Sequence, residues 1–100
     1  MLEVRKTDAF VKWIDGLRDI GAAARIQLRI ERLELGNPGD VRPVGAGVSE
    51  MRINYGPGYR VYFVQRGSVC VLLLCGGDKR TQVTDIARAK SLAEEWDNGA

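Results

Sequence analysis

The feature that most constrains the fold is a Gly-Pro-Gly turn at residues 56–58, which separates two segments of alternating polarity. Residues 48–55 precede the turn and residues 59–65 follow it, and in both segments apolar and polar side chains alternate with the period of a half-buried β-strand. Proline presets its own φ and glycine accepts a positive φ, so these residues suit a tight reversal of the chain. The pattern therefore predicts an antiparallel β-hairpin.

The length of the turn decides which side chains of this hairpin share a face. A three-residue loop pairs Tyr55 with Tyr59. One face then carries an apolar set: Met51, Ile53, Tyr55, Tyr59, Val61 and Phe63. The other face carries a polar set: Glu50, Arg52, Asn54, Arg60 and Tyr62. A two-residue loop mixes apolar with charged positions, which is disfavoured where one face is buried. We therefore expect two arginines, an amide and a phenol together on the face opposite the core. Guanidinium groups on rigid strands suit phosphate, because they present fixed and permanently charged donors.

Before the hairpin, the sequence predicts one short strand and two helices. The strand covers residues 2–5. Thr7 or Asp8 is the candidate N-cap of the first helix, and we expect Gly21 to end it. Its apolar stripe consists of Phe10, Trp13, Ile14 and Leu17. The second helix is expected over residues 22–35, and the glycines and proline of residues 36–39 stop it. Its buried stripe consists of Ile26, Ile30 and Leu33.

After the second helix, residues 40–47 are expected to form a polar loop. Beyond the hairpin, Arg66 and Gly67 turn the chain into residues 69–75, which are apolar on both faces and should be covered on both. A last helix is expected from about Thr84, with Ile86, Ala89, Ala93 and Trp96 at helical spacing. We interpret the chain as one α+β domain over residues 1–100. In it, an N-terminal strand and a helical hairpin pack on an antiparallel sheet, and a C-terminal helix follows.

Composition bounds the class of protein. One hundred residues make one domain with a small core, and 45% hydrophobic with 28% charged residues is ordinary for a globular chain. The net charge of +2 does not by itself indicate a nucleic-acid partner. Its distribution is more informative, because residues 41–77 contain four arginines and a single acid, Glu50. The sheet region is therefore predicted to be basic.

The sequence also indicates a compartment and the absence of metal chemistry. We see no signal peptide and no apolar segment long enough to span a bilayer, so a cytoplasmic location is expected, with no membrane partner. Cys70 and Cys75 should point to opposite faces of their strand and be buried. The chain has no histidine and no CxxC spacing, so neither a disulfide, a metal site nor another cofactor is expected.

Without histidine, the chemistry has few candidates. They are Arg52, Arg60, Tyr62, Lys79, Arg80, Asp85 and Glu50. Lys79 follows two glycines that allow backbone to approach a ligand, and a desolvated lysine beside arginines can act as a base. Structural alternatives stay open for each. The two glycines also suit a simple turn, Glu50 also suits a weak surface ion pair with Arg52 or Arg60, and the helical stripe Arg25, Arg29 and Arg32 also suits a solvated face.

Three strings resemble a known family. The first is residues 48–63, with Gly-Tyr-Arg at 58–60. The second is residues 73–79, with Gly-Gly-Asp-Lys at 76–79, and the third is Asp-Ile-Ala-Arg-Ala at 85–89. Together they resemble the addiction module killer protein branch of the RelE/ParE toxin superfamily, which is HigB-like and phage-derived. The order of elements is similar over nearly the whole chain. The resemblance implies a toxin of a type II toxin–antitoxin system, whose partner is a small antitoxin with a helix-turn-helix domain. Many RelE-like members cleave mRNA on the ribosome, and ParE-like members poison DNA gyrase.

The resemblance also assigns roles to residues. Arg60 matches the arginine that holds the scissile phosphate in RelE-type nucleases, Lys79 and Arg80 match a basic group after the last long strand, and Arg52 lies near basic residues of the preceding strand. RelE-like sequences often carry a tyrosine, or in some relatives histidines, near Asp85 and Ile86, where this chain has neither. The general acid and base are therefore left open.

We thus expect a ribosome-dependent, metal-free mRNA endoribonuclease that inhibits translation, with ribosome and mRNA as partners. Arg60, Arg52 and Lys79 are the predicted catalytic residues. The predicted substrate-binding residues are Arg80, Asn54, Tyr62 and Arg42. Two alternatives remain: a ParE-like gyrase inhibitor without catalysis, and a nontoxic RNA- or protein-binding module of the same fold.

Overall fold

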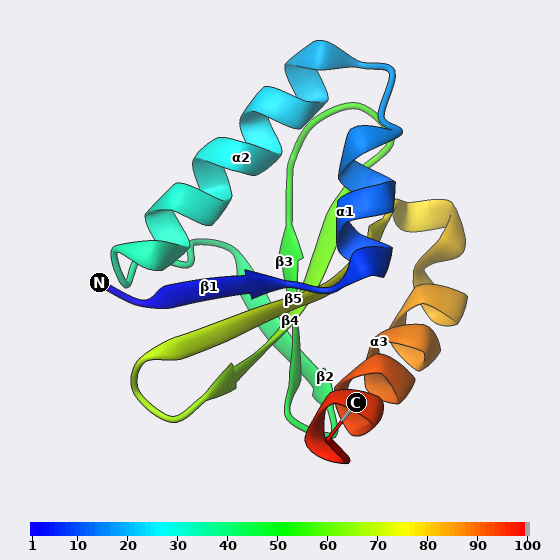
Figure 1. Cartoon of the computed structure of the whole chain (residues 1–100). Coiled ribbons are helices and arrows are strands. Elements are labelled where there is room, and N and C mark those ends of the chain that lie inside the picture. The colour runs from blue at the N-terminus through cyan, green and yellow to red at the C-terminus, as the bar shows by residue number, and fades with distance from the viewer. Residues whose placement is uncertain (100) are drawn as a thin grey trace.

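The computed structural model describes residues 1–99 and has the predicted α+β architecture (Figure 1). The elements in chain order are β1 (Glu3–Lys6), α1 (Asp8–Asp15), α2 (Ile20–Glu34), β2 (Val41–Gly45), β3 (Val48–Arg52), β4 (Arg60–Arg66), β5 (Cys70–Gly77), the 3₁₀ turn η1 (Lys79–Thr81) and α3 (Gln82–Asp97). Within residues 1–99, no helix has both the length and the apolar character needed to cross a membrane.

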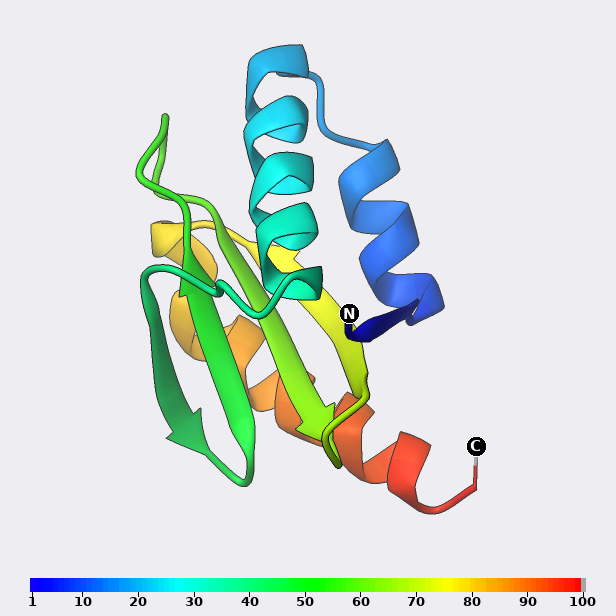
Figure 2. The ribbon, with the colours of Figure 1, turned by 90° about the vertical axis from the view of Figure 1, so that its left-hand side faces the viewer.

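The strands form one sheet in the order β1-β5-β4-β3-β2. The N-terminal strand β1 pairs with β5 in parallel, and every other pair is antiparallel. Helices α1 and α2 cover one face of the sheet, and α3 covers the other (Figures 1 and 2). The result is three layers, with the sheet in the middle.

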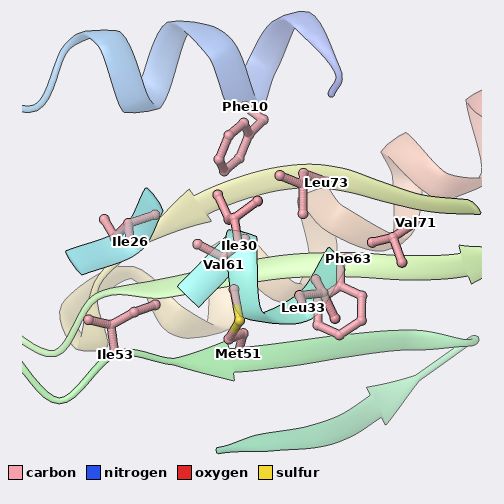
Figure 3. Close-up of a cluster of buried hydrophobic side chains, with 10 residues drawn as sticks. All are labelled: Phe10, Ile26, Ile30, Leu33, Met51, Ile53, Val61, Phe63, Val71 and Leu73. Atoms are coloured by element: carbon pink, nitrogen blue, oxygen red, sulfur yellow. The ribbon is translucent and has the colours of Figure 1, made fainter. Parts of the chain in front are cut away.

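The two faces of the hairpin are those predicted, but the predicted register is wrong. Tyr59 lies opposite Ile53 and not opposite Tyr55, so the register differs by two residues and the loop is longer than three residues. Arg52 lies opposite Arg60 and Met51 lies opposite Val61, and the amide of Ile53 donates to the carbonyl of Tyr59 at 2.9 Å. The strands are shorter than predicted, so the residues between β3 and β4 form a loop. The apolar face lies under α1 and α2, as expected, in a cluster that Figure 3 shows. Its buried members are Phe10, Ile26, Ile30, Leu33, Met51, Ile53, Val61, Phe63, Val71 and Leu73.

The boundary between the first two helices is not where the sequence predicts it. The side chain of Thr7 caps α1, as expected, but this helix ends at Asp15 with Gly16 as its C-cap. The next helix begins at Ile20, because the side chain of Asp19 accepts from the amide of Ala22. Gly21 therefore lies inside α2. A glycine in the first turn has a modest helical cost, of about 1 kcal/mol, which an N-cap can offset.

The prediction of a loop over residues 40–47 is also wrong. Residues Val41–Gly45 form β2, an edge strand that pairs with β3. Pro43 lies in this edge strand, which is where a sheet tolerates a residue without a backbone donor. Residues 41–45 form a strand because they pair with β3. The composition of residues 40–47 alone does not indicate this pairing.

Strand β5 is covered on both faces, as predicted, but its alternation is broken. Phe63 of β4 pairs with Leu73 and Tyr62 pairs with Cys75, so Leu74 is an extra residue on β5. Beyond this bulge the side chains change face. Cys75 therefore packs in the cluster under α3, and Cys70, whose partner Arg66 bonds to α3, lies on that face too. The prediction that the two cysteines point to opposite faces is wrong for this reason.

The face that was expected to lie opposite the core carries a second core. Helix α3 covers it through the small buried side chains of Ala89 and Ala93. The other buried members are Val48, Tyr62, Val64, Leu72, Leu74 and Cys75. The end of this face at Arg52 and Arg60 stays partly open, and Arg42 on the neighbouring edge strand is half exposed. The polar set of the hairpin is thus divided into a buried part and an accessible part.

Candidate functional site

The predicted catalytic residues meet at one end of the sheet. Arg52, Arg60 and Gly77 pair in a row across β3, β4 and β5. Lys79 follows directly after β5, and a methyl group added at Gly58 would lie 3.6 Å from its Cβ. The pairing of strands distant in sequence therefore brings Arg52, Arg60 and the stem of Lys79 together.

A shallow depression lies at this end of the sheet. It has a volume of about 300 Å³, and its lining residues are Asp40, Arg52, Ile53, Asn54, Gly58 and Arg60. We call it the arginine depression. Asn54 is exposed at its edge, so of the predicted substrate-binding residues this one shares a surface with both arginines.

Arg60 is the most constrained cation of the depression, since its side chain is only 12% exposed. Nη1 donates to the carbonyl of Gly58 at 2.5 Å. Nε is buried without a hydrogen-bond partner, and its nearest carboxylate oxygen, Oε2 of Glu50, is 3.7 Å away. Within residues 1–99, Nη2 forms no hydrogen bond. The guanidinium is therefore positioned by the protein but not saturated by it, which is the state that suits an incoming anion.

Glu50 is not the surface ion pair that the sequence allows, because it is fully buried. Its carboxylate accepts from Tyr62 Oη at 3.0 Å, from Gln82 Nε2 at 2.8 Å and from Arg42 Nε at 3.2 Å. A buried carboxylate needs such donors, because its lost hydration is otherwise uncompensated. Glu50 thus joins β2, β4 and α3 directly behind Arg60.

Tyr62 is a neutral donor inside this network. Burial, the hydrogen bond to Glu50, and the charges of Glu50 and Asp85 raise the pKa of Tyr62 above its ordinary value. Its side chain is fully buried, so Tyr62 supports Glu50 and does not line the arginine depression, although it was predicted to bind substrate. Arg42 is half exposed and can still face a ligand while it holds Glu50.

Arg52 forms an ion pair with Asp40, a residue that was expected to lie in a loop. Its Nη2 and Nε lie 2.8 and 3.3 Å from Oδ1 of Asp40. The hydrogen bond to Arg52 lowers the pKa of Asp40, and the same bond raises the pKa of Arg52. A phosphate that binds Arg52 must therefore compete with Asp40 or share the guanidinium with it.

The two cations of η1 differ. Arg80 is exposed and pairs with Asp78 at 3.1 Å, and this contact lowers the pKa of Asp78. Lys79 is exposed and forms no ion pair within residues 1–99. The expectation of a desolvated lysine is wrong, and Lys79 instead offers an uncommitted charge beside Gly58.

The glycines at the end of β5 accommodate side chains of the protein. A Cβ at Gly76 would overlap the ring of Trp13, and a Cβ at Gly77 would overlap the carboxylate of Asp85. They therefore serve packing, and the interpretation that they admit a ligand is not supported. Asp85 accepts from Thr81 Oγ1 at 2.5 Å and stands beside the strand partner of Arg60.

Sequence reasoning missed the part that Arg29 plays. Arg29 donates to the carbonyl of Arg52 at 2.6 Å and to that of Pro38 at 3.1 Å, and burial lowers its pKa. It therefore ties α2 to the end of β3. Its helical spacing with Arg25 and Arg32 was visible in the sequence, but the carbonyls it reaches were not.

The residues that could bind a cofactor are few. Within residues 1–99, no group of three or more His, Cys, Asp or Glu side chains is placed to hold a metal ion. The chemistry of the depression is that of fixed cations, an exposed amide and a single uncommitted lysine.

Comparison with known proteins identifies the family. The family model described as Phage derived protein Gp49-like (DUF891) matches residues 12–95. The chain belongs to this family. Gp49-like proteins are related to RelE- and HigB-like toxins of type II toxin–antitoxin systems. A protein of Haemophilus influenzae, described as uncharacterized, is 47% identical over 94 residues, which are 94% of this chain and 95% of that protein. Residues 12–95, which the family model matches, include the whole arginine depression.

Proposed function

We propose that this Gp49-like protein is the toxin of a type II toxin–antitoxin system and acts in the cytoplasm as a ribosome-dependent mRNA endoribonuclease. The family relationship supports the toxin assignment. The observation that carries the nuclease assignment is Arg60, which is nearly buried at the end of the sheet opposite Arg52 and whose Nη2 forms no hydrogen bond within residues 1–99. The partners in this proposal are a cognate helix-turn-helix antitoxin, the ribosome and mRNA, with no membrane.

In the proposed reaction, the 2′-hydroxyl of a nucleotide attacks the adjacent phosphorus. A bond from O2′ to phosphorus forms and the bond from phosphorus to O5′ breaks. O2′ gives up its proton to solvent and O5′ takes one up, so a 2′,3′-cyclic phosphate and a 5′-hydroxyl end result. Negative charge grows on the phosphoryl oxygens in the transition state, and preorganised cations stabilise it. Arg60 is the preorganised group, because packing and Gly58 hold it before substrate arrives.

The other residues assist this step in different ways. Arg52 adds a second guanidinium when the phosphate displaces or shares Asp40. Lys79 neutralises charge near the leaving oxygen or protonates it, and the proposal requires no metal. Asn54 and Arg80 contact the RNA at the rim, with Arg42 farther along the sheet. The site has few groups for proton transfer, so alignment of the RNA by the ribosome must supply much of the rate, as positioning can contribute several kcal/mol.

The proposal is tested with purified protein and translating ribosomes. Arg60→Ala should lower the cleavage rate roughly a hundred- to a thousand-fold, since this is typical for one electrostatic stabiliser. Arg60→Lys should also lose much activity, because an ammonium group lacks the planar fork that binds phosphate through two hydrogen bonds. The matched control is Arg66→Ala. Arg66 lies on the same strand and pairs with Asp97 at the opposite end of α3, so this variant should cleave normally.

The products provide a second check. Attack by the 2′-hydroxyl leaves a 2′,3′-cyclic or 3′-phosphate, and in this proposal cleavage persists in EDTA. If ribosomes give no cleavage, gyrase supercoiling is inhibited, and Arg60→Ala remains toxic, the nuclease assignment is wrong. A ParE-like gyrase inhibitor then replaces it.

A further inference from the structure

A second depression adjoins the arginine depression. It lies between α2 and the loop after β3, with a volume of about 280 Å³. Its lining residues are Arg25, Leu28, Arg29, Arg32, Ile53 and Asn54. We call it the α2 groove. Ile53 and Asn54 line both depressions, so the two form one continuous surface from Arg60 to Arg32.

The α2 groove carries positive charge that the protein neutralises only in part, through the charge of Asp40 near Arg29. None of its lining residues within residues 1–99 is acidic. Arg29 is held by neutral backbone carbonyls, which orient its guanidinium without cancelling its charge. The guanidinium of Arg25 lies 4.6 Å from the ring centroid of Tyr55, and Arg32 forms no ion pair within residues 1–99. Burial and the charge of Arg32 lower the pKa of Arg29, and an anion bound between the two arginines would relieve their repulsion.

The form of the surface fits a polyanion better than a single anion. A lone phosphate needs one depression, whereas a single strand of nucleic acid carries a charge at every nucleotide and follows a basic groove. The strand would contact arginines through its phosphates, which position it without reading its sequence. The exposed amide of Asn54 stands where the two depressions meet, within reach of a base or sugar.

We propose that the α2 groove binds the sugar–phosphate backbone of the RNA next to the scissile nucleotide, so that one strand runs from Arg60 past Asn54 to Arg25 and Arg32. This inference rests on the proposed function, because it takes RNA as the substrate of the arginine depression. It adds a binding site on the α-helical layer, outside the sheet residues that perform the cleavage. Arg29 is the positioning residue of this groove, since its hydrogen bonds hold the backbone at Arg52.

The test measures binding of a fluorescein-labelled, 2′-O-methyl RNA octanucleotide, which the protein cannot cleave, by fluorescence anisotropy at several salt concentrations. The Arg25→Gln/Arg32→Gln double variant should weaken binding roughly tenfold or more, with a salt slope smaller by about 0.7 for each lost phosphate contact. Arg32→Gln alone should show about half of the change in slope. Glutamine is a good helix former, so α2 should persist, which circular dichroism checks. The control is Arg88→Gln, an exposed residue on α3, which should bind as the wild type does.

The inference and the proposed function fail in different ways. Unchanged octanucleotide binding by the double variant, or no binding by the wild type at low salt, overturns the inference even if ribosomal cleavage proceeds. Loss of binding in the double variant supports the inference even if no cleavage occurs. If the groove variants instead lose binding of an acidic octapeptide while RNA binding is unchanged, the surface recognises a protein and the inference is wrong. The exposed Leu28 in the lining makes this last comparison necessary.

Discussion

At the scale of single residues, the candidate site depends on the buried carboxylate of Glu50. Glu50 is fully buried and receives donors from three elements, and it also lies 3.7 Å from the buried Nε of Arg60. Its network fixes the floor of the arginine depression while leaving Arg60 available. Glu50 is buried while Arg52 and Arg60 stay partly accessible, because α3 begins at Gln82, which contacts Glu50.

Replacement of Glu50 should therefore be costly for stability. Glu50→Ala leaves the hydroxyl of Tyr62, the amide of Gln82 and the guanidinium of Arg42 without their acceptor, so the free energy of unfolding should fall by roughly 3–5 kcal/mol. Tyr62→Phe removes a single hydrogen bond and should lose only about 0.5–1.5 kcal/mol. Urea denaturation measures both. A loss below about 1 kcal/mol for Glu50→Ala would contradict a buried, fully engaged carboxylate.

The two cysteines give a prediction on pH. Burial, with the nearby charge of Asp85, raises the pKa of Cys75 from 9.0 to about 12. Because the folded-state pKa is the higher one, the stabilisation from the neutral thiol is present below pH 9 and is lost as pH rises towards 12. Native protein at pH 8 should react with a thiol reagent at the partly buried Cys70, and at Cys75 only on unfolding. The Cys70→Ser variant provides the control, and rapid native labelling of that variant would contradict the prediction.

At the scale of elements, the end of β5 determines how α1 and α3 approach the sheet. Gly76 leaves room for the ring of Trp13 on the α1 side, and Gly77 leaves room for Asp85 on the α3 side. The bulge just before them turns Cys75 towards α3. These neighbouring adjustments place η1, and with it Lys79, next to the hairpin loop.

Gly76→Ala should consequently destabilise the protein through Trp13. The added methyl group overlaps the indole ring in a packed interior, and such overpacking typically costs about 1–3 kcal/mol. A double-mutant cycle with Trp13→Leu assigns the cause, because the smaller side chain should relieve most of the penalty. Thermal or urea unfolding provides the measurement. Equal penalties in the wild-type and Trp13→Leu backgrounds would show that the clash lies elsewhere.

At the scale of the whole molecule, both faces of one sheet are covered, and the end of the sheet that carries Arg52 and Arg60 is partly open. Helices α1 and α2 cover one face, and α3 covers the other but begins at Gln82, beside the buried Glu50. The arginine depression lies just beyond this start, and the α2 groove opens next to it. A basic surface of this kind also offers an acidic or apolar segment of an antitoxin a place to bind.

The proposed toxin should act in cells as a folded whole. Expression of the chain alone should arrest bacterial growth, and co-expression of its cognate antitoxin should restore growth. Arg60→Ala at equal abundance should permit growth, because it removes the transition-state cation and leaves both cores in place. Growth curves with quantified protein levels make the measurement. Normal growth with abundant folded wild-type protein in the native host would count against the toxin assignment.

Local pattern alone was enough for much of this fold. Alternation in the two arms of the hairpin predicted that Arg52 and Arg60 share one face of the sheet, because a one-residue slip would move every apolar side chain out of the core. The capping side chain of Thr7 and the buried stripe Ile26 and Ile30 were visible for the same reason, since helix periodicity and caps are properties of neighbouring residues.

Tertiary contacts decided the rest. Residues 41–45 became a strand because β3 lay beside them, and Cys75 changed face because a bulge fits β5 to β4. Glu50 and Tyr62 were buried by a helix that begins twenty residues after Tyr62, and Arg29 found carbonyls of two other segments. An alternating sequence determines which side chains share a face of the sheet, but which distant element covers that face depends on packing that local periodicity does not record.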